Sequence, residues 1–259
     1  MRGLGAIAVS AVCLSAAVAL ATPPGPGHPF DDDDAGCVPD TTAHRKCSET
    51  LDKAFARLIS AVTSCHDRQV RMAFSGSLVD DEACEAKARL RLEATVAALA
   101  PLCSPTQLSL ASAEETDLLD STHPRSLDAQ NGDVYCDSTS GVPLDLTGED
   151  AGWVPASPDA LWCARGVAKN LAKLAQASLK CHAKMAYSFY TGRDFDEEAC
   201  EEFDPLTHRG ARDRYSLRVA KLLAHGGCPS CLDGVQQEAL ALRTVGQMDS
   251  DNARLYPCP

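Results

Sequence analysis

The chain has 259 residues, with 36 acidic against 24 basic side chains and a formal net charge of −12. An acidic chain with no basic block along its sequence argues against nucleic acid and anionic membrane surfaces as partners. Aromatic residues make up only 5% of the chain, whereas 13 residues are cysteine. This composition argues against a large aromatic core, and we expect disulfide bonds to supply the missing stability.

Residues 1–21 have the pattern of a secretory signal peptide. A basic Arg2 precedes an apolar run that ends in small residues at Ala21, after which we expect cleavage. The run is too short and too interrupted to favour a retained membrane anchor, and Val12 is a poor residue before a lipid-modified Cys13. We therefore predict a secreted or periplasmic protein with no membrane span after signal removal. Loss of Cys13 from the 13 leaves an even number of cysteines, which predicts about six disulfide bonds in an exported chain.

The segment 22–36 is rich in proline and glycine and then carries four consecutive aspartates. This composition is typical of a disordered linker. The aspartate run is a candidate calcium ligand, but nothing in the sequence holds its carboxylates together. A solvated linker is the preferred interpretation.

The chain contains one sequence pattern twice. When each position is compared with the one 116 residues later, thirteen of the thirty-nine positions from Cys47 to Glu85 are identical, and no gap is needed. The second copy then carries an insertion of about nine residues, after which Cys103 aligns with Cys228. This pattern indicates an internal duplication.

The tails of the two copies are also alike. The sequence LDAQNGDVYC at 127–136 corresponds to MDSDNARLYPC at 248–258. We therefore expect a first helical repeat at 37–137, a linker at 138–154 and a second helical repeat at 155–259. Each repeat is small enough to need its disulfides.

Apolar residues and cysteines recur every three or four positions from Cys47 to Cys65, which predicts one apolar stripe along an α-helix. Eighteen residues are five helical turns, so both cysteines lie on one face, about 27 Å apart at the helical rise. A second stripe runs from Cys84 to Cys103, with its cysteines about 28 Å apart. Gly76 is expected to end the first helix as a C-cap residue.

Acidic residues precede the second helix of each copy. Asp80 is expected to cap this helix in the first copy, with Asp81 and Glu82 near its positive end. In the second copy, the same helix-start role is preferred over acid–base catalysis for Asp196, Glu197 and Glu198.

Equal cysteine separations on neighbouring helices predict an antiparallel hairpin with a disulfide near each end. The predicted bonds are Cys47–Cys103 and Cys65–Cys84, and by analogy Cys163–Cys228 and Cys181–Cys200. The remaining cysteines are expected to close each tail onto its own hairpin, through Cys37–Cys136 and Cys231–Cys258. Geometry leaves open an exchange of roles between Cys228 and Cys231. The predicted fold is therefore all-α, with two tandem disulfide-stapled antiparallel helical hairpins.

His66 and His182 each follow a cysteine of the stripe, about 100° around the helix and so beside the seam. They are candidate metal ligands, with a boundary position as the alternative. The boundary position is preferred, because oxidation of Cys65 and Cys181 removes the thiolates that a metal would bind best. Cys65-His66-Asp67 also resembles part of a helix of secreted phospholipases A2. The second copy lacks the aspartate, however, and no glycine-rich calcium loop lies upstream.

The strongest enzymatic signal is Cys-Pro-Ser-Cys at 228–231. A Cys-x-x-Cys before a helix can lower a thiol pKa and support disulfide exchange, and the proline resembles thioredoxin-like oxidoreductases. The sequence lacks the strand–helix alternation of that fold, and the first copy has a single cysteine at this place. A thiol–disulfide oxidoreductase that uses Cys228 and Cys231 is therefore an alternative function.

In the rhythm of its cysteines, about eighteen residues apart within Lys- and Ala-rich helices, the chain resembles uncharacterised exported cysteine-rich helical-hairpin proteins of environmental bacteria. The resemblance covers 47–103 and 163–228. It implies the helical-hairpin fold and brings no known activity.

We expect a non-enzymatic binding or structural role outside the cytoplasm, without a cofactor, toward an extracytoplasmic protein or a small ligand. A duplicated chain would offer two equivalent sites or one site between the copies. A carrier of an apolar ligand, held between the hairpins, is the second alternative. Small residues at or beside the seams argue against a large cavity there, since they favour close helix packing; they are Ala54, Ala61 and Ala88.

Overall fold

The computed structural model describes residues 23–30, 34–77, 79, 81–145 and 150–259. The expected signal peptide at 1–21 and the expected cap Asp80 lie outside these residues. Within them the fold is all-α, as predicted, and the only β-type pairings are two isolated bridges. No helix in this part of the chain is both long enough and apolar enough to cross a membrane. The helices, including two short 3₁₀ helices, are α1 Thr42–Phe74, α2 Glu82–Leu99, α3 Pro105–Leu119, α4 Leu127–Val134, η1 Ser138–Ser140, α5 Pro158–Tyr190, α6 Glu197–Glu201, α7 Ala211–His225, η2 Ser230–Leu232 and α8 Gly234–Leu255.

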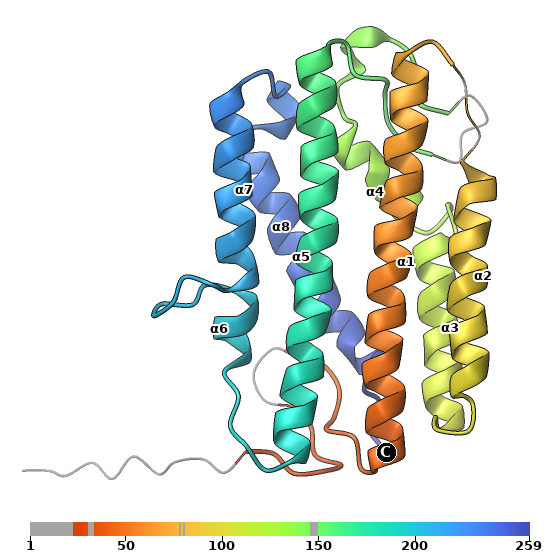
Figure 1. Cartoon of the computed structure of the whole chain (residues 1–259), viewed down its shortest axis with the longest axis vertical. Coiled ribbons are helices and arrows are strands. Elements are labelled where there is room, and N and C mark those ends of the chain that lie inside the picture. The colour runs from red at the N-terminus through yellow and green to blue at the C-terminus, as the bar shows by residue number, and fades with distance from the viewer. Residues whose placement is uncertain (1–22, 31–33, 78, 80, 146–149) are drawn as a thin grey trace, which may run out of the picture.

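Two long helices, α1 and α5, form the centre of the bundle (Figure 1). They run side by side in opposite directions, and the hydroxyl groups of Thr42 and Tyr190 lie 2.8 Å apart where the start of α1 meets the end of α5. Helix α2 packs on α1, α7 packs on α5, and α8 crosses behind α5 (Figure 1). The central pair therefore brings together one helix from each of the two similar segments.

Local sequence explains where the long helices begin and end. Thr41 accepts a hydrogen bond from the backbone of His44 and so caps α1, and Ser157 caps α5 through Ala160. Helix α1 ends at Phe74, and Gly76 follows with a positive φ of 81°, which confirms the predicted stop. Both helices have 33 residues.

The second helix of each hairpin differs between the two halves. Helix α2 is continuous over 18 residues, whereas its counterpart starts as the five-residue α6 and resumes as α7. The break coincides with the predicted insertion, at 202–210. As predicted, Asp196 caps α6 through the backbone of Ala199, at 2.8 Å.

The main hydrophobic core joins both halves and also includes Ala88, Leu92 and Leu99 of α2. Leu51, Phe55 and Val62 of α1 belong to the same buried cluster as Leu179 and Met185 of α5. The two predicted hairpins therefore share one core, and each covers the apolar side of the other.

All twelve cysteines of the described chain are paired in six disulfide bonds. Four are the predicted hairpin bonds Cys47–Cys103, Cys65–Cys84, Cys163–Cys228 and Cys181–Cys200. The predicted tail bonds Cys37–Cys136 and Cys231–Cys258 are wrong, because the tails cross between the halves. The structure instead has Cys37–Cys258 and Cys136–Cys231.

The crossing has a visible cause at the start of the chain. The backbone N–H of Cys37 donates to the carbonyl oxygen of Tyr256 at 2.8 Å, which lays this segment along the end of α8 and beside Cys258. Phe30 is buried there and packs edge-on against the ring of Tyr256, with ring centroids 5.6 Å apart. The described part of 22–36 therefore belongs to the folded body and is not the disordered linker that its composition predicts.

Candidate metal centres

The two inner disulfides place a histidine beside a carboxylate in each half. Cys65–Cys84 joins α1 to the first turn of α2, and the residues after these cysteines are His66 and Glu85. The Nε2 atom of His66 lies 2.8 Å from Oε1 of Glu85. The Cys65–Cys84 disulfide therefore holds the acidic first turn of α2 beside His66.

Three further carboxylates complete a group that we call the His66 cluster. Oxygens of Asp128 on α4 and Asp150 each lie 3.2 Å from Nε2 of His66, and an oxygen of Asp81 lies 4.0 Å away. Gln69, one turn further along α1, donates to Asp81 at 2.9 Å and to Asp150 at 2.6 Å. The cluster therefore joins α1, α2, α4 and the segment before α5.

The other half repeats this arrangement in the His182 cluster. Nε2 of His182 lies 3.1 Å from oxygens of both Asp34 and Glu201, 3.4 Å from Asp249 and 3.9 Å from Glu197. His182 and Glu201 follow Cys181 and Cys200, which are joined by the equivalent disulfide. Three members lie 116 residues after His66, Asp81 and Glu85, and they are His182, Glu197 and Glu201.

Two similar loops deliver the aspartates that are most distant in sequence. Asp-Ala-Gly occurs at 34–36 and again at 150–152. The backbone N–H of Ala35 donates to the carbonyl of Asp249, and that of Ala151 donates to the carbonyl of Asp128, both at 3.3 Å. Each loop is thus tied by its backbone to the tail residue whose side chain belongs to the same cluster.

The clusters are buried and strongly acidic. The side chain of His182 is 0% exposed, and that of Asp34 is 2% exposed. Among the described residues, no lysine or arginine forms an ion pair with any of the eight carboxylates. Each cluster therefore gathers four carboxylates around one imidazole, which can neutralise at most one of them. A charge of this size is costly to bury without a further cation.

Several of these polar atoms also lack a hydrogen bond. Both ring nitrogens of His182 are buried without a partner of acceptable geometry, although four carboxylate oxygens surround Nε2. Buried polar groups are nearly always satisfied, so such atoms point to a missing partner. The unsatisfied carboxylate oxygens are Asp81 Oδ2, Glu85 Oε1, Glu197 Oε1, Glu201 Oε1, Glu201 Oε2 and Asp249 Oδ1.

The buried acids strongly perturb one another. Burial, reinforced by the charge of Asp150, raises the pKa of Asp81 to about 8. Burial, together with the contact to Glu201, raises the pKa of Glu197 to about 11. Burial alone would lower the pKa of His66, but its carboxylate neighbours raise it well above the usual value, and the same holds for His182. Perturbations of this kind are typical of functional sites.

The distances match those between ligands of a single metal ion. Imidazole nitrogen and carboxylate oxygen bind transition metals at about 2.0–2.2 Å, which places neighbouring ligand atoms about 3.0–3.4 Å apart and opposite ones about 4.2 Å apart. The distances from Nε2 to the four oxygens run from 2.8 to 4.0 Å around His66 and from 3.1 to 3.9 Å around His182. In the His66 cluster, His66 and one oxygen each of Asp81, Glu85 and Asp150 lie within 4.8 Å of one another and can share one ion. His182 belongs to two such groups, one with Asp34 and Asp249 and one with Glu197 and Glu201, and either group can hold an ion.

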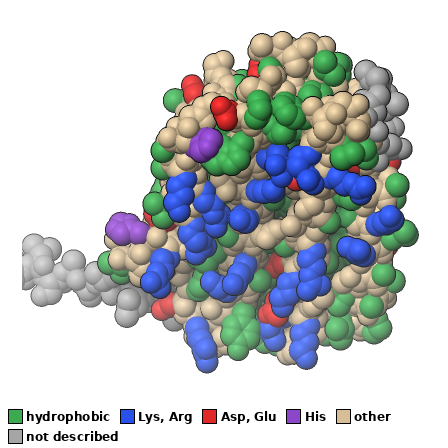
Figure 2. All heavy atoms as spheres, turned by 45° about the horizontal axis from the view of Figure 1, so that its top comes forward, with side chains coloured by type: hydrophobic (Ala, Val, Ile, Leu, Met, Phe, Trp, Pro, Cys, Tyr) green, Lys and Arg blue, Asp and Glu red, His purple; other side chains and the backbone are tan. Residues whose placement is uncertain are grey.

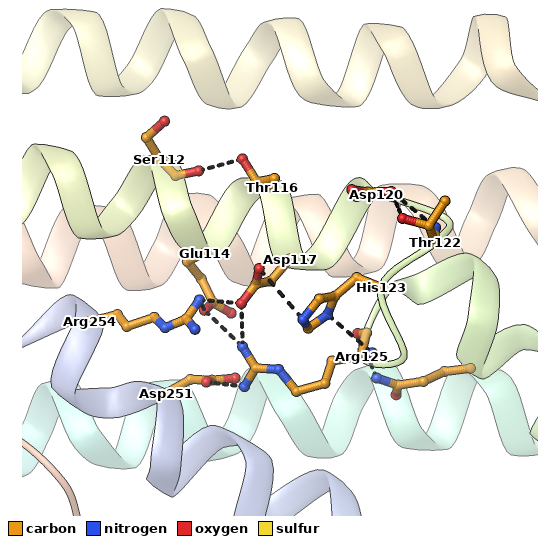
Figure 3. A network of polar contacts seen from close by, with 11 residues as sticks. Ser112, Glu114, Thr116, Asp117, Asp120, Thr122, His123, Arg125, Asp251 and Arg254 are labelled. Carbon is orange, nitrogen blue, oxygen red and sulfur yellow. Dashed lines mark hydrogen bonds and ion pairs between the residues drawn. The ribbon is translucent and has the colours of Figure 1, made fainter.

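A third group of acids differs from these two and serves as a comparison (Figure 3). Glu114 and Asp117 on α3 and Asp251 on α8 lie around Arg125 and Arg254, with ion-pair distances that include 2.9 Å from Arg254 to Glu114. Here two arginines face three carboxylates, so most of the charge is neutralised by the protein itself. This network ties α3 to α8 and needs no added ion.

The Cys-x-x-Cys motif at 228–231 does not form a disulfide of its own. Cys228 and Cys231 are not bonded to each other, because Cys228 pairs with Cys163 and Cys231 with Cys136. The oxidoreductase alternative therefore lacks the Cys-x-x-Cys disulfide on which it depends.

A cavity of about 90 Å³ does lie between the halves, bounded by Ile59, Leu171 and Leu240 among others, with His66 at its wall. It is small beside the roughly 300–1,000 Å³ of ordinary ligand pockets, so it offers little room for an apolar cargo.

Sequence reasoning named the two histidines but placed them at the edge of the seam, whereas both are buried. It read Asp81 and Glu197 as helix-start charges, yet both side chains face a histidine. Asp34 was considered only as part of the aspartate run, and Glu85 and Glu201 were not identified although each follows a paired cysteine. Asp128, Asp150 and Asp249 were missed because they lie far from the histidines in the chain. Two sequence signals would have found them: the repeated Asp-Ala-Gly, and the alignment of Asp128 with Asp249 in the similar tails.

The fold and its clusters define a class: an all-helical, disulfide-linked protein with two equivalent histidine–carboxylate centres. No protein-family model, curated protein or solved structure matches the chain.

Proposed function

We propose that this protein is an exported, non-enzymatic metal-binding protein that holds one metal ion in each of its two clusters. The observation that carries the proposal is that oxygens of four carboxylates lie within 4.0 Å of one imidazole nitrogen, twice in the chain and with no lysine or arginine partner among the described residues. Export is supported by the signal-like sequence at 1–21 and by six disulfides, which persist in oxidising compartments.

The ligand chemistry narrows the class of ion. Carboxylates suit hard ions such as manganese, whereas imidazole suits zinc and iron. Calcium usually takes oxygen ligands alone, and copper(I) prefers sulfur, which is absent here because Cys65, Cys84, Cys181 and Cys200 are oxidised. A divalent first-row ion of the manganese, iron or zinc class therefore fits best.

A bound ion would also have a structural role in the fold. In each cluster it would connect a long central helix, the next helix along the chain, a residue of the tail and an Asp-Ala-Gly loop. The predicted structural role and the predicted binding role are then two aspects of the same sites. The extracytoplasmic partner or small ligand expected from the sequence stays a prediction.

The test is a Mn²⁺ titration of chelator-treated protein, followed by calorimetry and by the loss of the free-ion electron paramagnetic resonance signal. We expect two ions per chain for the wild type and one for His66→Ala or for His182→Ala. Glu85→Gln and Glu201→Gln preserve side-chain size and should each weaken one site, so the test remains valid where a histidine variant folds poorly. His44→Ala is the matched control, because His44 pairs with Asp40 at the surface.

Two results would overturn the proposal. If the clusters were held together by imidazolium and shared protons alone, the wild type would bind neither Mn²⁺ nor Zn²⁺ above the level of the double histidine variant. If the ions bound elsewhere, the four cluster variants would retain two ions per chain.

A further inference from the structure

A second feature of the molecule is a basic face on an acidic protein. Exposed lysines and arginines of α1, α2, α5 and α7 gather on the side of the molecule seen in Figure 2. Arg57 and Arg91 line one groove, Arg57 also lines a second groove with Lys53 and Lys180, and Lys184 lies within electrostatic reach of Lys180 and Arg214. We use the term basic face for Lys53, Arg57, Arg91, Lys180, Lys184 and Arg214.

The charges of this face are not neutralised by the protein. None of the six side chains forms an ion pair with any residue that the structure describes. Burial, together with the charges of Lys180 and Arg214, lowers the pKa of Lys184, and burial together with Arg214 lowers the pKa of Arg218. Like charges thus lie close enough to disfavour one another, which is a cost that an anionic partner would relieve.

The face coexists with a net charge of −12 because many acids are inside the molecule. The eight carboxylates of the two clusters are turned inward, and so are Asp67, Glu114 and Asp251. On the side seen in Figure 2, lysine and arginine side chains (blue) outnumber the aspartate and glutamate side chains (red). The sequence argument against nucleic acid and anionic membranes rested on the net charge and on the lack of a basic block along the chain, and neither describes how the folded protein separates its charges.

The shape of the face suits an extended chain. Helices of 33 residues are about 50 Å long, and α1 and α5 run antiparallel along the whole face. Small side chains such as Ala56, Ser60 and Ala183 line these grooves together with the cations. Asp52 also lines one groove, but it is buried and accepts a hydrogen bond from Tyr256.

In the part of the chain that the structure describes, the basic face has no free exposed aromatic ring that could stack on a nucleic acid base or form the centre of a protein interface. Base stacking and protein hot spots both use exposed aromatic rings. Among the described residues, the exposed large aromatic rings are already engaged. Trp162 stacks on His225, Tyr187 lies under Arg45, and Phe203 lies under Arg212. Ligand binding on this face would therefore depend mainly on its positive charges.

We propose that the basic face binds an extended anionic polysaccharide, a chain whose sulfate or carboxylate groups lie along α1 and α5. Such polymers are met outside the cytoplasm, where six disulfides place the protein, and they need no stacking ring or deep pocket for recognition. The binding rests on surface charge and is independent of metal in the clusters.

The experiment measures binding of fluorescently labelled heparin and of alginate by anisotropy, with chelator present, at low and at high salt. We expect both polymers to bind and the affinity to fall about tenfold or more between 50 and 300 mM NaCl, because exposed charges are screened over about a Debye length. Arg57→Ser with Lys180→Ser should weaken binding about tenfold, since two central cations are lost. The matched control is Arg193→Ser with Arg209→Ser, two exposed loop arginines outside the face, which should change it less than twofold.

Three outcomes would sink the proposal. The first is the absence of binding to either polysaccharide at 50 mM NaCl. The second is equal weakening by the control pair, which would show that total charge and not this face decides the affinity. The third is tighter binding of single-stranded DNA than of heparin at equal charge concentration, which would identify a nucleic acid surface instead.

Discussion

Gly36 and Gly152 decide where the aspartates of the two Asp-Ala-Gly loops lie. Both have positive φ values, 110° and 120°, which cost other residues about 1–3 kcal/mol. A Cβ atom on Gly36 would lie 2.6 Å from the carbonyl oxygen of Tyr256, and one on Gly152 would lie 3.0 Å from that of Tyr135. Neither position can accept alanine unless the loop that carries its aspartate moves.

Gly36→Ala should therefore lower the melting temperature and weaken metal binding in the His182 cluster, because Asp34 is two residues away. The destabilisation should exceed the roughly 1–3 kcal/mol of backbone strain, since the close contact is with main-chain atoms. Denaturant unfolding and Mn²⁺ titration measure the two effects. Gly246→Ala on α8, where nothing lies within 4 Å of the new Cβ, should be neutral or slightly stabilising. Full metal affinity in Gly36→Ala would contradict the role assigned to the loop.

Glu114 makes a separate residue-level prediction about pH. Burial, with the nearby charge of Asp251, raises the pKa of Glu114 to about 7, above its unfolded value of 4.5. The stability that this group contributes is fully present below pH 4.5 and is lost as the pH rises through 7. Above that range the network holds three carboxylates against two arginines.

Glu114→Gln should reduce the fall in unfolding free energy between pH 5 and pH 8, because the amide has no proton to lose and two acids then face two arginines. Urea unfolding at both pH values measures this difference. Asp133→Asn is the control, since Asp133 is an exposed partner of Arg243 and its loss should leave the pH dependence in place. An equally steep fall in Glu114→Gln would show that other groups cause it.

At the scale of elements, local periodicity predicts the disulfides within each hairpin but not those between the two halves. The spacing of Cys47, Cys65, Cys84 and Cys103 follows from helical geometry alone, so their pairing could be predicted. The pairing of Cys37 could not, because it depends on the backbone contact between its segment and Tyr256 on the far end of the chain. No repeating pattern records a contact of that kind.

The crossing disulfides make an element-level prediction about the centres. Cys37 lies three residues after Asp34, so Cys37→Ser with Cys258→Ser should loosen the loop that completes the His182 cluster. We expect a loss of about 2–5 kcal/mol in unfolding free energy, the usual range for a native disulfide. In a His66→Ala background, which retains only the second site, Mn²⁺ affinity should fall. In a His182→Ala background the same serine pair should leave the remaining site unchanged. Equal losses in both backgrounds would indicate a general loss of folding.

At the scale of the whole molecule, the antiparallel pairing of α1 and α5 explains both what the sequence predicts and what it hides. The all-α class, the repeated helices and four disulfides are set by patterns within about sixty residues. The clusters draw residues from 34 to 249, and the basic face draws them from four helices. The His182 cluster and the basic face combine residues of both halves, and such long-range contacts are not described by net charge or periodicity.

Metal loading should accordingly stabilise the entire fold rather than one hairpin. An ion that binds only the folded state at one hundred times its dissociation constant adds about 2.7 kcal/mol per site, so two sites should add about 5 kcal/mol. Differential scanning calorimetry of chelator-treated protein with and without Mn²⁺ measures the shift. We expect about half the shift in His66→Ala and in His182→Ala, and none in the double variant. Because both ions tie helices to the shared core, the transition should remain single in every sample. A transition that splits on loading would mean that the two halves unfold independently and that each ion stabilises only its own half.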